Sequence, residues 1–317
     1  MNSLIIPVYK NAENIPSLIH ALKKLNGEIE NLEVVFVVDG SPDTSAGLLT
    51  QLLPLSGLNA QLLLLSRNFG SYAAIRAGLI AAKGERFAVM AADLQEPPWL
   101  VNAFFKVLEN DPVDIVIASR ESRDDPLFSR VASNMFWAVY KKFVVPEMPD
   151  GGVDVFGCNL VFRDQLVQLD ESHSSLVALL FWMGFRRKEI SYSRLARQHG
   201  KSAWTFKKKY VYLKDSVFSF TDVPIKLLTC IGTIGILFST LMAMVILLSR
   251  TFGWIIVPGY SATILTIIFF GAVNLLGLGI VGTYSWRTYE NTKRRPSVLV
   301  MTRVDFSSVK PNPQDPI

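Results

Sequence analysis

Short apolar runs alternate with amphipathic stretches through the first 120 residues of the chain. The apolar runs predict buried strands over residues 4–8, 33–38, 61–65, 86–91 and 115–118. Apolar residues at helical spacing predict helices over residues 12–25, 44–53, 71–82 and 100–108. Strands that alternate with helices of this length are typical of an α/β fold with a doubly wound, mostly parallel sheet.

The pattern changes after Pro224, where two long apolar runs follow each other. Residues 227–248 contain no charged side chain, and Asn274 is the one strongly polar residue of the run 264–284. A helix needs roughly 20 apolar residues to cross a membrane. A pair of buried core helices is the alternative, but core helices rarely stay uncharged over such a length. The sequence therefore predicts two C-terminal transmembrane helices within residues 225–290.

Two further stretches, residues 128–143 and 210–220, are amphipathic and rich in aromatic side chains. Each fits either a helix that faces the core or an interfacial helix in the headgroup region of a membrane. We expect a globular domain over residues 1–220 that contains both. Residues 291–317 hold four prolines, which predict a loosely ordered cytoplasmic tail.

Basic residues set the expected orientation of the two spans. Five lysines precede the first span and three basic residues follow the second, whereas the connection between the spans carries only Arg250. Because positive residues stay on the cytoplasmic side, we expect both termini and the globular domain in the cytoplasm. Residues 1–9 lack the basic n-region and cleavage site of a signal peptide. The two cysteines fit a reducing compartment.

The positive charge is concentrated just before the first span. The whole chain carries a net charge of +5, whereas residues 186–214 hold ten basic residues and one acidic residue, which gives +9 for that segment alone. Such a segment favours anionic lipid headgroups, and it fits the phosphates of a ligand equally well. A nucleic acid partner is not expected, because the segment is tethered to a bilayer.

Four stretches carry specific motifs. They read LIIPVYKNAENI over residues 4–15, VVDGSPDTS over 37–45, LSRNFGSYAAIRAG over 65–78 and ADLQEPP over 92–98. Together they resemble glycosyltransferase family 2, in particular its polyprenyl-phosphate branch. The resemblance covers residues 2–220, and the two predicted spans match that branch as well. It implies a GT-A type sheet and a metal-dependent enzyme that transfers a hexose.

The resemblance also implies the substrates and the location. The donor would be a nucleotide-sugar, with UDP-glucose or a related UDP-sugar expected, and the acceptor a polyprenyl (undecaprenyl) phosphate. Transfer would proceed with inversion at the cytoplasmic face of a bacterial inner membrane. Two alternatives stay open: a transferase acting on a glycan or lipid-linked glycan, and a non-catalytic nucleotide-sugar-binding membrane protein.

The donor side of the site is expected at the ends of the first three strands. A carboxylate such as Asp39 can accept a hydrogen bond from a nucleobase, and Gly40 permits the turn that would aim it; a purely turn-forming aspartate is the alternative. Arg67 and Asn68, on the loop after the third strand, can reach the nucleotide or the sugar, with an ordinary surface loop as the alternative. The resemblance implies that Pro7 and Tyr9 contact the nucleotide-sugar as well. It further implies a flexible loop that closes over the donor phosphates, built from Arg197, Lys201 and Ser202.

Two oxygen ligands for a divalent cation follow the fourth strand. The resemblance assigns Asp93 and Gln95 to Mg²⁺ or Mn²⁺, and a hard cation held by oxygens neutralises the charge of a departing diphosphate. Asp93 therefore also counts as a catalytic residue; a helix-capping aspartate before Pro97 is the alternative. The motif departs from the family at Ala91, where an aspartate is usual, and at Lys10 and Asn11, where Asn-Glu is usual.

The acceptor side depends on residues further along the chain. Asp154, in the stretch GGVDVFGCN, is the candidate catalytic base, with a turn aspartate as the alternative. Arg120 and Arg130 are candidates for the lipid phosphate, or solvated charges. Small residues along the second predicted span favour close helix packing, either against the first span or in a homo-oligomer, which the resemblance also suggests.

Overall fold

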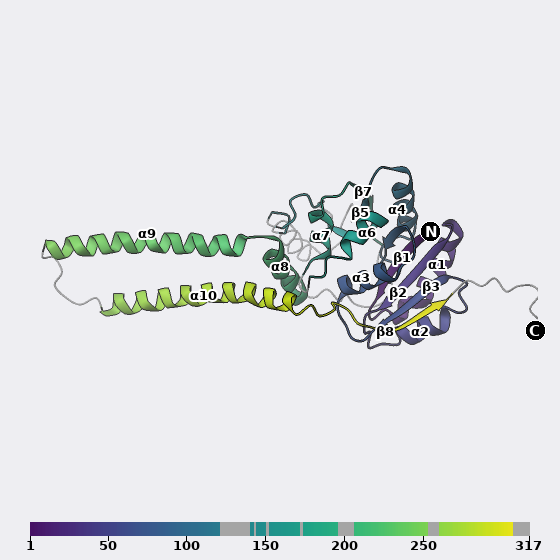
Figure 1. Ribbon diagram of the computed structural model, residues 1–317, viewed down its shortest axis with the longest axis horizontal. Helices are drawn as coiled ribbons and strands as arrows, with labels where there is room; N and C mark the ends of the chain where they lie inside the picture. The colour runs from purple at the N-terminus through teal and green to yellow at the C-terminus, as the bar shows by residue number, and fades with distance from the viewer. Residues whose placement is uncertain are drawn as a thin grey trace, which may run out of the picture. The chain divides into compact units, whose positions relative to one another are not determined.

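The computed structural model describes residues 1–120, 140–142, 144–149, 152–171, 174–195, 206–252 and 260–306. The chain forms two compact units. The first comprises Met1–Tyr210 together with Pro296–Ile317, and the second comprises Val211–Arg295. The chain therefore leaves the first unit before the apolar helices and returns to it after them (Figure 1).

One sheet forms the centre of the first unit (Figure 1). Within the described residues its strand order is β7-β5-β6-β4-β1-β2-β3-β8. The strands are β1 (Asn2–Val8), β2 (Leu32–Val38), β3 (Asn59–Leu65), β4 (Arg86–Val89), β5 (Ile115–Arg120), β6 (Val153–Asn159), β7 (Arg187–Tyr192) and β8 (Val300–Phe306). The run β3-β2-β1-β4 is parallel throughout, which confirms the predicted parallel α/β arrangement.

Helices cover both faces of the parallel strands. The 3₁₀ turn η1 (Ala12–Asn14) leads into α1 (Ile15–Glu28); α2 (Ser45–Leu52), α3 (Ser71–Ala81), α4 (Trp99–Asn110), α6 (Leu160–Leu166) and α7 (Leu176–Trp182) follow. On one face the side chains of α1, α2 and α4 pack with alternate strand residues such as Ile6 and Phe36. On the other, α3 approaches closely through Gly78, where a Cβ would lie 2.5 Å from Ile5. All seven residues of β2 are buried, because both faces are covered.

The sheet is extended by an antiparallel strand that the hydrophobic pattern did not predict. β6 lies between β4 and β5 and runs antiparallel to both, with Gly157 opposite Ala88 and Val116. A Cβ at Gly157 would lie 2.9 Å from the Cβ of Phe104, so glycine lets α4 pack on this strand. Because β6 runs the other way, its first residues lie at the edge where β4 and β5 end.

The chain after the second apolar helix corrects the expectation of a loosely ordered tail for residues 300–306. This segment forms β8, which pairs antiparallel with the edge strand β3. Leu62 pairs with Val304 in the register, and the backbone amide of Ser66 donates to the carbonyl of Leu299 at 3.0 Å. The hydrogen bonds with β3 therefore order this segment, although its own sequence does not predict a strand.

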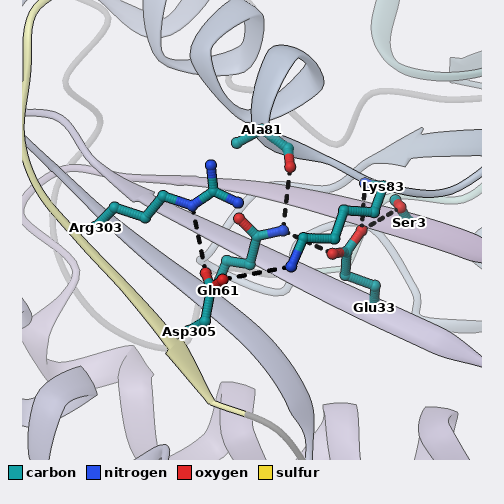
Figure 2. A network of polar contacts seen from close by, with 7 residues as sticks. All are labelled: Ser3, Glu33, Gln61, Ala81, Lys83, Arg303 and Asp305. Atoms are coloured by element: carbon teal, nitrogen blue, oxygen red, sulfur yellow. Dashed lines mark hydrogen bonds and ion pairs between the residues drawn. The ribbon is translucent and has the colours of Figure 1, made fainter.

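A buried polar network centred on Glu33 connects the amino-terminal parts of β1, β2 and β3 (Figure 2). The Glu33 carboxylate accepts hydrogen bonds from the Ser3 hydroxyl at 2.6 Å, the Gln61 amide at 2.7 Å and the Lys83 backbone amide at 2.8 Å. The Lys83 ammonium in turn pairs with Asp305 of β8 at 3.3 Å. Hydrogen-bonding partners compensate the cost of burying this carboxylate. The network therefore links β1, β2 and β3 with the end of α3 and with β8.

The second unit contains most of α8 (Phe206–Phe220), α9 (Val223–Thr251) and α10 (Tyr260–Thr292). Within the described part of the chain, Phe269–Thr292 is long and apolar enough to cross a membrane. Val211–Phe220 and Val223–Gly235 pass the same test as a pair, with a bend of 77° between them. Arg287 of α10 pairs with Asp215 of α8 at 2.7 Å. Of the amphipathic stretch 128–143, only residues 140–142 are described.

Candidate functional site

The polar residues predicted for the donor side gather at one edge of the sheet. Tyr9 follows β1, Asp39 follows β2, Asn68 lies three residues after β3, and Asp93 lies four residues after β4. These four strands are neighbours and parallel, so their carboxyl ends share an edge. Ligands of doubly wound sheets bind outside that edge. The topology therefore brings together in space a set of residues that the chain separates by more than 80 positions.

Asp39 holds the loop that follows β3. Its side chain is buried and accepts hydrogen bonds from the backbone amides of Phe69 at 2.7 Å and Gly70 at 2.9 Å, and from the Asn68 side chain at 2.9 Å. Burial raises the pKa of the Asp39 carboxyl, whereas the two backbone amides oppose that rise. We call residues 66–70 the donor loop, after the prediction that Arg67 and Asn68 contact the donor. The first role of Asp39 is thus to shape this loop.

Gly40 allows the donor loop to lie directly against the end of β2. Its φ is +54°, a left-handed conformation that favours glycine. A Cβ there would lie 2.2 Å from the carbonyl carbon of Arg67 and 2.4 Å from the amide nitrogen of Asn68. Both atoms belong to the backbone, so they cannot swing aside as a flexible side chain would. The Asp-Gly pair therefore sets both the direction of the carboxylate and the distance of the loop.

A second aspartate in the same motif, Asp43, organises the loop after β1. Its carboxylate accepts from the amide of Ala12 at 3.0 Å and from the hydroxyl of Ser41 at 2.6 Å. Burial alone would raise the pKa of Asp43, but hydrogen bonds from Ser41, Ser45 and Ala12 outweigh it and lower the pKa. Ser41 also accepts from the backbone amide of Lys10, whose φ is +54°. The sequence contained this aspartate within VVDGSPDTS, but its partner in the loop after β1, Ala12, is 31 residues away.

The loop after β4 is tight and reaches across to the segment after β7. The Asp93 carboxylate is half-buried and accepts from the backbone amide of Gln95 at 3.3 Å. Leu94 between them has a φ of +55°, which strains a bulky side chain. The guanidinium of Arg194 donates to the Gln95 side-chain oxygen at 2.8 Å and lies 3.8 Å from Glu96. Arg194 was not predicted as a site residue, although it belongs to the basic segment.

The oxygen ligands at this edge fit a cation that a diphosphate would also coordinate. Mg²⁺ is commonly held by one or two carboxylates together with substrate phosphates. Asp93 offers such a carboxylate at the correct edge, and within the described residues no group of three acidic, His or Cys side chains forms a complete metal cage. The Gln95 oxygen faces the Arg194 guanidinium, so it would exchange that partner on binding a cation.

The remaining predicted residues lie partly outside the described chain. Arg120 ends β5, opposite Tyr192 of β7, and Asp154 is the second residue of β6, next to Val153, which pairs with Ser119. Both backbones are therefore at the same edge as Asp93. The Asp154 side chain is outside the described atoms. Four other candidates also fall outside the described residues: Arg130, Arg197, Lys201 and Ser202.

The chain has clear relatives among known proteins. A family model described as "Glycosyl transferase family 2" matches residues 3–169. A putative glycosyltransferase, CsbB, of Bacillus subtilis is 34% identical over 304 residues, covering 94% of this chain and 90% of that protein. An undecaprenyl-phosphate 4-deoxy-4-formamido-L-arabinose transferase of Proteus mirabilis is 28% identical over 313 residues, covering 98% and 95%. A glucosyl-3-phosphoglycerate synthase of Mycobacterium tuberculosis aligns with a TM-score of 0.49 at 15% identity, covering 68% and 80%.

Proposed function

Because this chain belongs to glycosyl transferase family 2 and is a glycosyltransferase, we propose that it transfers a sugar from a nucleotide-sugar to a polyprenyl phosphate at a membrane surface. The similarity to a transferase named for an undecaprenyl-phosphate substrate carries this proposal, because it extends over 98% of this chain and thus includes the apolar helices. The candidate spans of the second unit are consistent with a lipid substrate.

The donor is a nucleotide-sugar, with UDP-glucose or a related UDP-sugar as the proposed compound. The edge formed by β1, β2 and β3 supports this assignment. Asp39 holds the donor loop so that Arg67 and Asn68 lie exposed at the edge of the sheet. Pro7 is the next-to-last residue of the neighbouring strand β1, and Tyr9 follows that strand directly. Arg197, Lys201 and Ser202 complete the donor side in this proposal, by contacting the phosphates.

Asp93 and Gln95 hold the cation, Mg²⁺ or Mn²⁺, in this proposal. When bound, such a cation neutralises the charge of the diphosphate leaving group. Asp93 contributes a carboxylate fixed by the backbone of its own tight loop. Arg194, which donates to Gln95 in the structure, brings a second positive charge to the same edge. The chain thus gathers positive charge where the diphosphate would depart.

The acceptor needs orientation more than activation. A phosphate monoester has a second pKa of about 6 and is largely ionised at neutral pH. In the proposed reaction one of its oxygens attacks the anomeric carbon while the bond from that carbon to the donor diphosphate breaks, which inverts the configuration. Asp154, at the same edge as Asp93, positions the acceptor or takes a remaining proton. Arg120 and Arg130 bind the acceptor phosphate.

We propose that the protein is anchored in a bacterial cytoplasmic membrane by α9 and α10, with the first unit in the cytoplasm. Basic residues before α9 and after α10 support this orientation, since positive residues stay inside. α8 then lies in the headgroup region, and its bend of 77° from the start of α9 fits a change from the membrane surface to the membrane interior. A homo-oligomer in the membrane is part of the proposal.

Transfer assays with the full chain test this function. The protein in lipid nanodiscs is given a panel of nucleotide-sugars with undecaprenyl phosphate, Mg²⁺ or Mn²⁺, and products are identified by mass. We expect one sugar added to the lipid phosphate, and loss of the product with a chelator. Transfer to a glycan but not to the lipid phosphate would replace the proposed acceptor. Binding of nucleotide-sugars without turnover under any condition would replace catalysis by binding.

A further inference from the structure

The chain that follows the second apolar helix contacts the donor loop and the helix behind it. We call residues 297–305 the return segment. It meets residues 66–83 at three places: the Leu299 carbonyl accepts from the Ser66 amide at 3.0 Å, the Ser297 hydroxyl accepts from Arg76 at 2.9 Å, and Asp305 pairs with Lys83 at 3.3 Å. The last of these joins the buried Glu33 network (Figure 2).

The first contact lies at the start of the donor loop. Ser66 is the residue directly before Arg67, and the ladder between β3 and β8 changes register at Leu65 as the loop begins. From the opposite side, Asp39 holds the amides of Phe69 and Gly70. The loop is therefore fixed at both ends, by β2 on one side and by the return segment on the other.

The second contact fixes the helix that continues the donor loop. Arg76 of α3 has a side chain that is only 12% exposed and spans three partners. Its guanidinium donates to Ser297 at 2.9 Å and to the Val167 carbonyl at 2.7 Å, and lies 3.3 Å from Asp170. Charge-assisted bonds of this kind are the stronger hydrogen bonds in proteins. The return segment thus shares with α6 and its following turn the task of holding α3.

From these contacts we propose that the return segment positions the donor loop, so that nucleotide-sugar affinity depends on the chain beyond the second apolar helix. The inference rests on the proposed donor site. If the loop were held on one side alone, it would sample more conformations. Donor binding would then cost more conformational entropy, which weakens the affinity. A consequence for biosynthesis follows: the donor site is complete only after both apolar helices and β8 have been made.

Two truncations test the role of the segment in nanodiscs. One ends after Phe306 and keeps β8; the other ends after Arg295 and removes it. We expect the first to match the full chain. The second should raise the donor KM and weaken UDP binding by calorimetry, each about tenfold, equivalent to about 1.4 kcal/mol. Its acceptor KM should stay unchanged, and a peptide of residues 296–306 should restore donor affinity by pairing with β3.

Point variants keep the test informative if the shorter chain does not fold. Ser297→Ala removes one bond to Arg76 and should raise the donor KM by about threefold, the size expected for one hydrogen bond. Thr302→Ala, at an exposed position of β8, is the control and should change neither KM. Equal donor KM values for Ser297→Ala and the full chain, or a parallel rise of both KM values, would overturn the proposal.

Hydrogen exchange separates this inference from the proposed function. Amides of residues 66–70 should exchange faster in the chain ending at Arg295 than in the chain ending at Phe306, whatever the substrate. If the full chain neither binds UDP nor transfers sugar, the proposed function fails, while faster exchange still supports the positioning role. If exchange is equal in both chains, the return segment does not hold the loop, and the inference fails alone.

Discussion

The buried carboxylate of Asp39 accepts a hydrogen bond of 2.7 Å from the backbone amide of Phe69, thirty residues further along the chain. This contact, with the neighbouring bond to Gly70, ties the end of β2 to the loop after β3. An aspartate that the sequence marks for nucleobase binding therefore shapes the site before any ligand arrives. In this arrangement the loop and the carboxylate act as one unit, and a change at either should alter donor binding.

Replacing Asp39 by asparagine should weaken the donor loop. The asparagine side chain has one acceptor oxygen where the carboxylate has two. At least one N–H group of Phe69, Gly70 or Asn68 would therefore face the asparagine NH₂ group, which is itself a donor. A buried donor without an acceptor costs about 1–3 kcal/mol. We expect a lower denaturant midpoint, faster amide exchange at Phe69 and Gly70, and weaker UDP binding. Unchanged exchange at those two amides would contradict the loop-holding role.

Gly40→Ala should be more damaging than Gly57→Ala. Both glycines have positive φ values, +54° and +71°, so both variants carry the backbone strain of about 1–2 kcal/mol. Only Gly40 faces backbone atoms, with Arg67 at 2.2 Å, whereas nothing lies within 4 Å of a Cβ at Gly57. Denaturation should show an additional loss of about 2 kcal/mol for Gly40→Ala. Equal losses would mean that the loop moves aside freely.

Asp93→Ala should abolish sugar transfer and Mn²⁺ binding while the fold is retained. The side chain is half-buried and accepts a hydrogen bond from a backbone amide of its own loop, so its removal opens no large cavity in the core. Asp164→Ala, on the exposed side of α6, serves as the control. The checks are Mn²⁺ titration by electron paramagnetic resonance, product formation and circular dichroism. Near-normal transfer by the folded variant would remove Asp93 from the proposed cation site.

Arg194→Ala should strengthen cation binding in the absence of donor. The Arg194 guanidinium donates a hydrogen bond of 2.8 Å to the Gln95 side-chain oxygen, so that oxygen is not available to a cation. The positive charge of the guanidinium also repels a cation. Arg194 also lies 3.8 Å from the buried Glu96 carboxylate, so its removal leaves that negative charge less compensated, and the affinity for the cation should rise by about three- to fivefold. Mn²⁺ titration without nucleotide measures the effect. Lys188→Ala in β7 is the control, because the Lys188 ammonium pairs with Asp111 and not with Gln95. A weaker Mn²⁺ affinity would show that Arg194 orients Gln95 for the cation instead.

Acid should destabilise the junction of β5, β6 and β7 through Asp114. Hydrogen bonds from Arg186, and to a smaller extent from Asn159, hold the pKa of Asp114 below its ordinary value of 3.8. Because its pKa is lower in the folded than in the unfolded state, the Asp114 carboxylate stabilises the fold fully at pH values above the unfolded-state pKa. That contribution is lost as the pH falls through the folded-state pKa. Asp114→Asn should therefore be less stable than the parent at pH 7 and approach it below about pH 3.8. A constant difference across this range would contradict the assignment.

The parallel half of the fold could be predicted from the sequence. Residues 34–38 form an unbroken apolar run because β2 is buried on both faces, and the helices on either side follow from their spacing. β7 and β8 could not be predicted in this way. β7 is an edge strand with exposed Lys188 and Glu189, and β8 is exposed over most of its length, so neither has a burial pattern to detect. Their conformation comes from pairing with β5 and β3.

The sequence alone placed Asp39, Arg67 and Asp93 at one edge, because the carboxyl ends of neighbouring parallel strands coincide. What those side chains contact was decided by tertiary structure. Asp39 bonds to a loop thirty residues away, and Gln95 bonds to Arg194 ninety-nine residues away. The same holds for the return segment, whose contacts with Ser66 and Arg76 join chain regions more than 200 residues apart. Such contacts depend on strand order and register, which local propensities do not determine.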